Sequence, residues 1–205
     1  MTAIKSPTRS TPAAATTING IDTADLRDCI AAISADPREG ATTWTINSRW
    51  KGGTRADHHV DGCRIAGANI ERKFTISTDE PHELCGTNQF ANPQECLLAG
   101  LNACMMVGYT AVAALMGIRL TSLEVRTTGD IDLRGFLGIS PDVPAGYPSL
   151  RQEVRIAGDA TPERFAELHN IVKATSPNFF NITRAIPVTS SLIVDAGSSA
   201  CEMTL

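Results

Sequence analysis

The most constraining feature of this sequence is the stretch 96–118, which contains no charged side chain. Just before it, Asn92 and Pro93 form a typical helix start, with the asparagine as cap and the proline at the first helical position. Glu95 follows in the first turn, where a carboxylate suits the positive end of the helix dipole. We predict a helix over 92–118 that is apolar around most of its circumference and buried on nearly all sides.

A membrane span is the alternative for this stretch, because about 20 apolar residues suffice to cross a bilayer. Asn102, Tyr109 and Thr110 interrupt the apolar run, as do three glycines, and no basic cluster flanks either end. These features favour a central helix enclosed by sheet, in a protein that has no membrane partner.

Composition indicates one globular domain. The chain has 205 residues, 42% hydrophobic and 20% charged, and its net charge of −4 without a basic cluster argues against nucleic acid as a partner. Residues 1–18 are rich in Ser, Thr, Ala and Pro and lack the apolar core of a signal peptide, so we expect a flexible arm before a domain over 19–205. A cytoplasmic location is expected, with free thiols rather than disulfides at Cys29, Cys63, Cys85, Cys96, Cys104 and Cys201.

The hydrophobic pattern on either side of the central helix predicts an α+β fold with antiparallel sheet. The part over 19–91 contains a small surface helix and three β-segments, with a turn at Gly52-Gly53 and another at Asp61-Gly62. The part over 119–205 reads as ββαβ, with a long Gly/Pro loop over 134–149 and a helix capped by Thr161. The three parts of the expected domain are therefore 19–91, 92–118 and 119–205.

Few residues offer chemistry. The four histidines show no HxH, HExxH or Cys/His ligand spacing, and no dinucleotide or phosphate-binding glycine motif occurs, so we expect neither a metal nor a cofactor. Among the thiols, Cys104 lies in the middle of the apolar helix, where a cysteine is more often core than reagent. Because it is far from a helix N-terminus, a reactive Cys104 needs a cation from another segment. Cys96 lies about 12 Å away along the helix, beyond disulfide reach.

The segment from Asn92 to Cys104, NPQECLLAGLNAC, resembles the NPxxLLAALAAC helix of the OsmC/Ohr proteins, the osmotically inducible and organic hydroperoxide resistance proteins. GDIDLRGFLGIS, SPNFFNITRAIPV and the early NGIDTADLRDCIAAISADP resemble longer OsmC-like members, so the resemblance spans roughly Asn19 to Val194. It implies an intertwined homodimer in which long central helices are enclosed by antiparallel sheets.

The resemblance also implies a reaction. Family members reduce organic hydroperoxides through a cysteine on the central helix, which is Cys104 here, and an arginine after a Gly-Gly turn keeps that sulfur ionised. The nearest match is Arg55, one residue out of the usual register after Gly52-Gly53-Thr54. The alternative interpretation of Arg55 is that it is an exposed strand residue without a catalytic role.

Two departures from the family pattern limit this carry-over. The resolving cysteine that precedes a proline after the last helix is replaced by Ser176, whose simpler role is a helix cap. The carboxylate that anchors the arginine is replaced by the neutral Gln94, and Glu95 would point about 100° away around the helix. An oxidised Cys104 would therefore need an external thiol, unless Cys63, Cys85 or Cys96 approaches it.

Three hypotheses remain open. The first is a single-cysteine, thiol-dependent organic hydroperoxide reductase in oxidative-stress defence, with Cys104 as nucleophile, Arg55 as activating cation, and Gln94 and Ser176 as polar neighbours. Phe179 and Phe180 would line a pocket for bulky peroxides. The second is a non-catalytic dimer that binds a small apolar ligand, with Cys104 structural. The third is a purely structural dimer without a pocket.

Overall fold

The computed structural model describes residues 17–196 and 199–204. The expected arm over 1–18 lies outside this range except for Thr17 and Ile18, which form the first strand. The elements before the central helix are β1 (Thr17–Ile18), β2 (Ile21–Asp22), α1 (Thr23–Ala35), the 3₁₀ turn Pro37–Gly40, β3 (Thr42–Trp44), β4 (Asn47–Gly52), β5 (Arg55–Ile65), β6 (Ala68–Thr78) and the 3₁₀ turn His82–Leu84. The remaining elements are α2 (Pro93–Leu115), β7 (Leu120–Gly129), α3 (Leu133–Phe136), β8 (Leu150–Gly158), α4 (Pro162–Thr175), α5 (Pro177–Thr183), β9 (Ser191–Ala196) and β10 (Ser199–Thr204).

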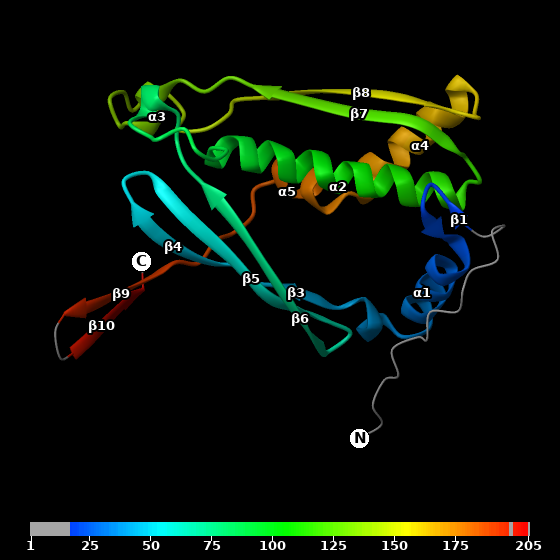
Figure 1. The fold of residues 1–205 in the computed structure, drawn as a ribbon, viewed down its shortest axis with the longest axis horizontal. Coiled ribbons are helices and arrows are strands. Elements are labelled where there is room, and N and C mark those ends of the chain that lie inside the picture. The colour runs from blue at the N-terminus through cyan, green and yellow to red at the C-terminus, as the bar shows by residue number, and fades with distance from the viewer. Residues whose placement is uncertain (1–16, 197–198, 205) are drawn as a thin grey trace.

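One half of the molecule is a packed layer structure around α2. The antiparallel pair β7–β8 runs along one side of α2, and α4 and α5 lie along another (Figure 1). The buried core sits between them and combines side chains of α2, the connection between α2 and β7, and α4. Its members are Leu101, Met105, Tyr109, Ala113, Ile118, Leu168 and Val172.

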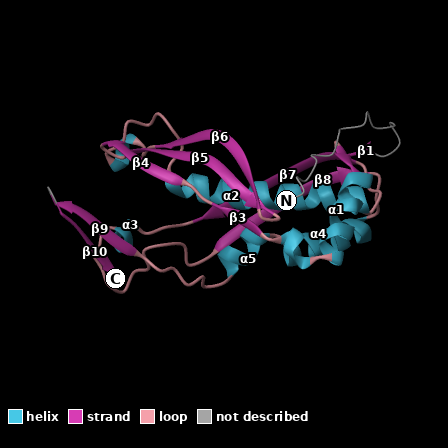
Figure 2. Cartoon of the chain, turned by 90° about the horizontal axis from the view of Figure 1, so that it is seen from below, coloured by secondary structure: helices cyan, strands magenta, loops and turns pink. Residues whose placement is uncertain are grey.

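The other half is a four-stranded antiparallel sheet, β3 to β6. We call this sheet the arm from here on, and it is distinct from the flexible N-terminal arm expected over 1–18. Strand β5 is its centre, with β6 along one edge and β3 and β4 along the other. The arm extends away from α2, and the hairpin β9–β10 projects separately from the end of the chain (Figures 1 and 2). The predicted fold class, α+β with antiparallel sheets, is confirmed. The predicted order is corrected in detail, because four strands rather than three lie between α1 and α2, and α3, α5 and β10 add to the predicted ββαβ part.

The central helix begins as predicted. The Asn92 side chain accepts a hydrogen bond from the Glu95 backbone at 2.8 Å, and the Glu95 carboxylate accepts one from the Asn92 backbone at 2.8 Å. Its burial differs from the prediction, because only 22% of its most apolar window is buried. Leu97 is 46% exposed and Val107 is 67% exposed, so one face of α2 packs while the other is open in the single chain. By length and composition α2 could cross a membrane, but its packed face belongs to the protein core.

Several local predictions are corrected by the structure. Asp61-Gly62 is not a turn, because β5 continues through it with a bulge between Val60 and Gly62, and the chain turns instead at Ala66-Gly67. The predicted loop over 134–149 begins inside a short helix, α3 (Leu133–Phe136). The Asp132 side chain caps this helix. The apolar face of α1 was expected to pack on the fold, yet Ile30 and Ile33 are 44% and 39% exposed.

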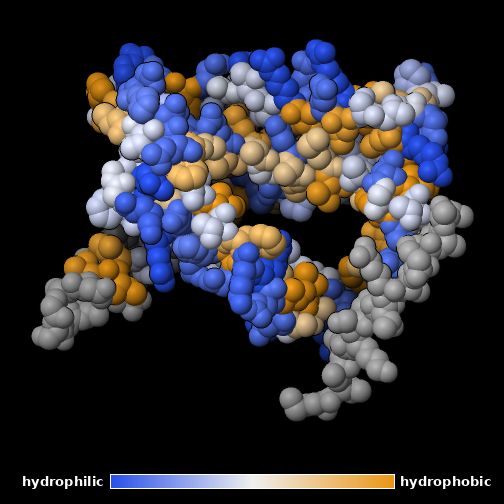
Figure 3. All heavy atoms as spheres, in the orientation of Figure 1, coloured by the Kyte–Doolittle hydropathy of each residue, from blue (hydrophilic) through white to orange (hydrophobic). Residues whose placement is uncertain are grey.

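Many large apolar side chains of the described residues are exposed in the single chain. Figure 3 shows apolar side chains around the opening between α2 and the arm. On the arm the large exposed apolar residues are Trp44, Ile46, Trp50, Ile65, Ile70, Phe74 and Ile76.

Candidate functional site

Cys104 contacts Ser176, and this contact is the centre of the candidate site. The Ser176 hydroxyl donates a hydrogen bond to the Cys104 sulfur at 3.3 Å. Cys104 is half-buried on α2, and Ser176 is 4% exposed at the junction of α4 and α5. The structure therefore brings together two residues that lie 72 positions apart in sequence, as the resemblance implied for this pair of positions.

Ser176 also has the structural role that the sequence predicted. Its backbone ends α4 by donating to the Val172 carbonyl at 2.9 Å, and its hydroxyl oxygen accepts from the Phe179 backbone at 3.3 Å as the cap of α5. Pro177 follows at the first position of α5. The Ser176 hydroxyl thus caps α5 at the α4–α5 junction and also donates a hydrogen bond to the Cys104 sulfur.

Arg55 lies at the start of β5, directly after the Gly52-Gly53-Thr54 turn. Its guanidinium carbon is 5.1 Å from the centre of the Phe90 ring, which places the cation over the aromatic face. Its Nε is buried and has no hydrogen-bond partner. No hydrogen bond joins Arg55 to Cys104 among the described residues, so the single chain does not bring this predicted pair together.

A buried carboxylate fixes the surroundings of Arg55. Asp79 is fully buried and accepts hydrogen bonds from the Thr54 hydroxyl at 2.7 Å, from the backbone and hydroxyl of Thr87, and from the Gln89 backbone at 3.2 Å. The side-chain hydrogen bonds from Thr54 and Thr87 hold the pKa of Asp79 well below its usual range. We call Asp79, Thr54, Thr87 and Gln89 the loop clasp.

The loop clasp was not found from sequence. Asp79 stands in a stretch, DEPHELCGTNQFANP, that reads as loop by composition, and nothing in that pattern shows that its carboxylate is buried. The pair formed by buried Tyr109 and half-buried His169 was also missed. Tyr109 was noted only as an interruption of the apolar run, and its hydroxyl bonds His169 Nδ1 on α4, 60 residues away.

Gln94 and Phe179 border a cavity of about 600 Å³ between α2, α5 and the segment before β8. Leu97 and Leu101 of α2 line it with Phe179, so its wall on this side is apolar. Phe180 does not line this cavity, because its side chain is 53% exposed with the Arg184 guanidinium carbon 4.7 Å from its ring centre. Of the two phenylalanines predicted to line a pocket, Phe179 lines this cavity, whereas Cys104 and Ser176 do not.

The described residues contain no group of three or more His, Cys, Asp or Glu that could hold a metal ion. Five of the six cysteines are free thiols in the structure, and the sixth, Cys201, has no described side chain. Cys63 is buried in β5, Cys96 is half-buried on α2, and Cys29 and Cys85 are exposed. None of these four is joined to Cys104.

The family model described as "OsmC-like protein" matches residues 86–191, which is more than half of the chain. The chain belongs to the OsmC-like family. The match covers α2, Cys104 and Ser176 but begins after Arg55 and Asp79. Comparison with curated proteins gives no match.

Solved structures of OsmC-like proteins share the fold. An OsmC-like protein of Mycoplasma pneumoniae superposes with a TM-score of 0.55 at 18% identity, over 69% of this chain and 87% of that chain. A Psychrobacter arcticus 273-4 protein, named for the osmotic stress and detoxification response, gives 0.51 at 16% identity, over 67% and 87%. An organic hydroperoxide resistance protein of Elizabethkingia anophelis gives 0.43 at 21% identity, over 69% and 89%.

Proposed function

We propose that this OsmC-like protein reduces organic hydroperoxides through Cys104, with an external thiol as reductant, in cytoplasmic oxidative-stress defence. The observation that carries the proposal is the hydrogen bond from Ser176 to the Cys104 sulfur. A hydroxyl that donates to sulfur stabilises the thiolate more than the thiol, and the thiolate is the nucleophile. Phe179, whose backbone N–H donates to the Ser176 hydroxyl, also lines an apolar cavity, and such a cavity suits an organic peroxide better than hydrogen peroxide.

The reaction balances with one cysteine and two external thiols. The Cys104 thiolate attacks the distal peroxide oxygen, the O–O bond breaks, and the alkoxide leaves and takes up a proton as the alcohol. Sulfur is oxidised by two electrons to the sulfenic acid. One thiol of a dithiol then condenses with it, releasing water and forming a mixed disulfide. The second thiol attacks that disulfide, which restores Cys104 and oxidises the reductant.

The proposal includes a homodimer. The single chain leaves one face of α2 and much of the arm sheet exposed, with Trp50 at 77% and Val107 at 67%. Obligate homodimer interfaces bury about 2,000–5,000 Å² of total accessible surface and are rich in apolar residues of this kind. In the dimer, Arg55 of one copy would approach Cys104 of the other and supply the positive charge that the single chain does not place there. The unpartnered Nε of Arg55 is consistent with that contact.

The test is consumption of cumene hydroperoxide with dithiothreitol as reductant. Cys104→Ser should abolish turnover, whereas the matched control Cys96→Ser, on the same helix, should retain it. Ser176→Ala should lower the rate about tenfold or more because it removes the hydroxyl donor, and Arg55→Gln should lower it further. Unchanged turnover in Cys104→Ser would rule out the reaction, and sulfenic acid trapping at Cys104 by dimedone provides a second readout.

A second candidate function is a non-catalytic dimer that holds a small apolar ligand. The cavity of about 600 Å³ favours it, and so does the fact that Cys104 bonds no cation among the described residues. In that case Cys104 would react slowly with iodoacetamide at neutral pH. Rapid alkylation of this one cysteine among six would count against it.

A further inference from the structure

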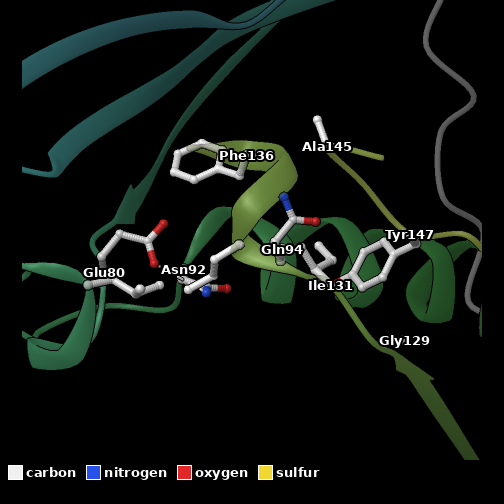
Figure 4. Close-up of a pocket in the computed structure, with 10 residues that line it drawn as sticks. Glu80, Asn92, Gln94, Gly129, Ile131, Phe136, Ala145 and Tyr147 are labelled. Carbon is white, nitrogen blue, oxygen red and sulfur yellow. Dashed lines mark hydrogen bonds between the residues drawn. The ribbon is translucent and has the colours of Figure 1, made fainter. Parts of the chain in front are cut away.

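We propose that a second pocket, between Glu80, the start of α2 and the segment 130–149, binds a small organic amine. The pocket has a volume of about 240 Å³ and lies apart from Cys104, which is not among its lining residues. Figure 4 shows Glu80 and Asn92 at one end of the pocket with the Phe136 ring beside them, Gln94 in the middle, and Ile131 and Tyr147 at the other end. The proposal does not depend on the peroxide reaction.

The walls of this pocket suit a flat apolar body. Ile131 and the rings of Phe136 and Tyr147 face the space (Figure 4). Phe136 is 69% exposed, so one face of its ring is open to a ligand. The volume corresponds to roughly eight waters at about 30 Å³ each, which is the size of one aromatic ring with a short side chain.

Glu80 supplies a site for a positive group. Its carboxylate accepts one long hydrogen bond, from Asn92 Nδ2 at 3.3 Å, although an ionised carboxylate has about four acceptor positions. Among the described residues no lysine or arginine forms an ion pair with it. Figure 4 shows this carboxylate on the same side of the pocket as the Phe136 ring, so an ammonium there would meet both a carboxylate and an aromatic face.

The charges around the pocket select against anions. Burial raises the pKa of the Tyr147 hydroxyl, and the negative charge of Glu95 raises it further. Neither lysine nor arginine is among the residues that line the pocket, and two arginines of the flanking segments are paired, Arg134 with Asp132 at 2.5 Å and Arg151 with Asp130 at 2.8 Å. A ligand carboxylate would therefore meet Glu80 with no cation in the pocket wall, whereas an amine is attracted.

The pocket is preformed. A Cβ at Gly129 would lie 2.4 Å from the Tyr147 ring, so only glycine allows that ring to pack on the strand end. The Asp132 side chain caps α3 and pairs with Arg134, which fixes the start of the short helix that carries Phe136. The loop clasp fixes the chain next to Glu80. Because these walls are ordered without a ligand, binding should cost little conformational entropy.

The test is calorimetric titration of the full chain with 2-phenylethylamine, 2-phenylethanol and 3-phenylpropanoate. We expect saturable binding of the amine, at least tenfold weaker binding of the alcohol, and none of the acid. Glu80→Gln should weaken amine binding at least tenfold, whereas the matched control Glu83→Gln, exposed on the same loop, should leave it unchanged. Phe136→Ala should also weaken it, and this surface position does not endanger folding.

Equal affinity for the three probes, or wild-type affinity in both Glu80→Gln and Phe136→Ala, would overturn the proposal. Failure to saturate with the amine would do the same. Cys104→Ser should bind the amine as the wild type does. An inactive peroxidase with an intact amine site and an active peroxidase without one are therefore distinguishable results.

Discussion

The two halves of this molecule are built from similar residues and reach opposite degrees of burial. Around α2, Met105, Leu168 and Val172 are completely buried between two layers. On the arm, Trp50 is 77% exposed and Phe74 is 57% exposed, although both stand on regular antiparallel strands. An antiparallel sheet normally packs one face on a core. The arm has the apolar residues for such a face, and its own chain does not cover them, so we infer that a second copy does.

The largest expected effect tests this inference directly. Phe74→Asp places a charge on the uncovered face of β6 and should convert a dimer to a monomer, because burying an unpaired carboxylate is strongly unfavourable. Lys73→Asp is the matched control, since neighbouring strand residues point to opposite faces. Light scattering after gel filtration gives the mass of each. A monomeric wild type, or a dimeric Phe74→Asp protein, would remove the basis for comparing the halves in this way.

A smaller effect is expected in the packed half. Leu168→Ala leaves a cavity beside α2 and should lower the free energy of unfolding by about 2–5 kcal/mol, because Leu168 is fully buried in the core cluster. Val188→Ala, at a site 85% exposed, should change it by less than about 0.5 kcal/mol. Urea denaturation measures both. Similar losses of unfolding free energy in Leu168→Ala and Val188→Ala would contradict this prediction, because burial within the single chain would then not determine the loss.

The smallest effect is a pH dependence at the Tyr109–His169 pair. Burial, followed by the charge of Lys173, lowers the pKa of His169. The unfolded chain therefore takes up a proton that the folded chain resists, so stability should fall as the pH drops below about 6.5. His169→Gln should flatten this slope, and His82→Gln, on an exposed loop, should not. Thermal melts across that pH range check it, and an unaltered slope in His169→Gln would assign the dependence to another group.

The sequence predicted most of what depends on local pattern. The cap at Asn92, the proline after it, the helix start at Thr161 and the two strands predicted between the central helix and that start all rest on neighbouring residues, and the structure confirms them. The resemblance correctly indicated the family and placed Ser176 opposite Cys104. Those parts could be predicted because helix caps and strand patterns depend on residues close in sequence, and because the family motif lies on one helix.

What the sequence did not reveal depends on distant partners. The burial of Asp79 arises from a turn 25 residues earlier, and no local pattern indicates which carboxylate such a turn will meet. The uniform apolar character of α2 predicted burial on all sides, yet hydrophobicity does not tell whether the same chain or another copy covers a face. Asp61-Gly62 was predicted to be a turn because Asp-Gly is a common turn dipeptide. The same dipeptide also fits a bulge in a continuous strand, and that is where it lies in the structure.

The loop clasp gives the arm and the amine pocket a common anchor. Thr54 precedes Arg55 at the tip of the arm, while Thr87 and Gln89 belong to the loop that begins at Glu80, and all of them bond one carboxylate. If a second copy binds the arm and shifts its tip, the shift would also move Glu80, the acidic residue of the pocket. Assembly and ligand occupancy then become linked equilibria, and each would alter the other's affinity by the same factor.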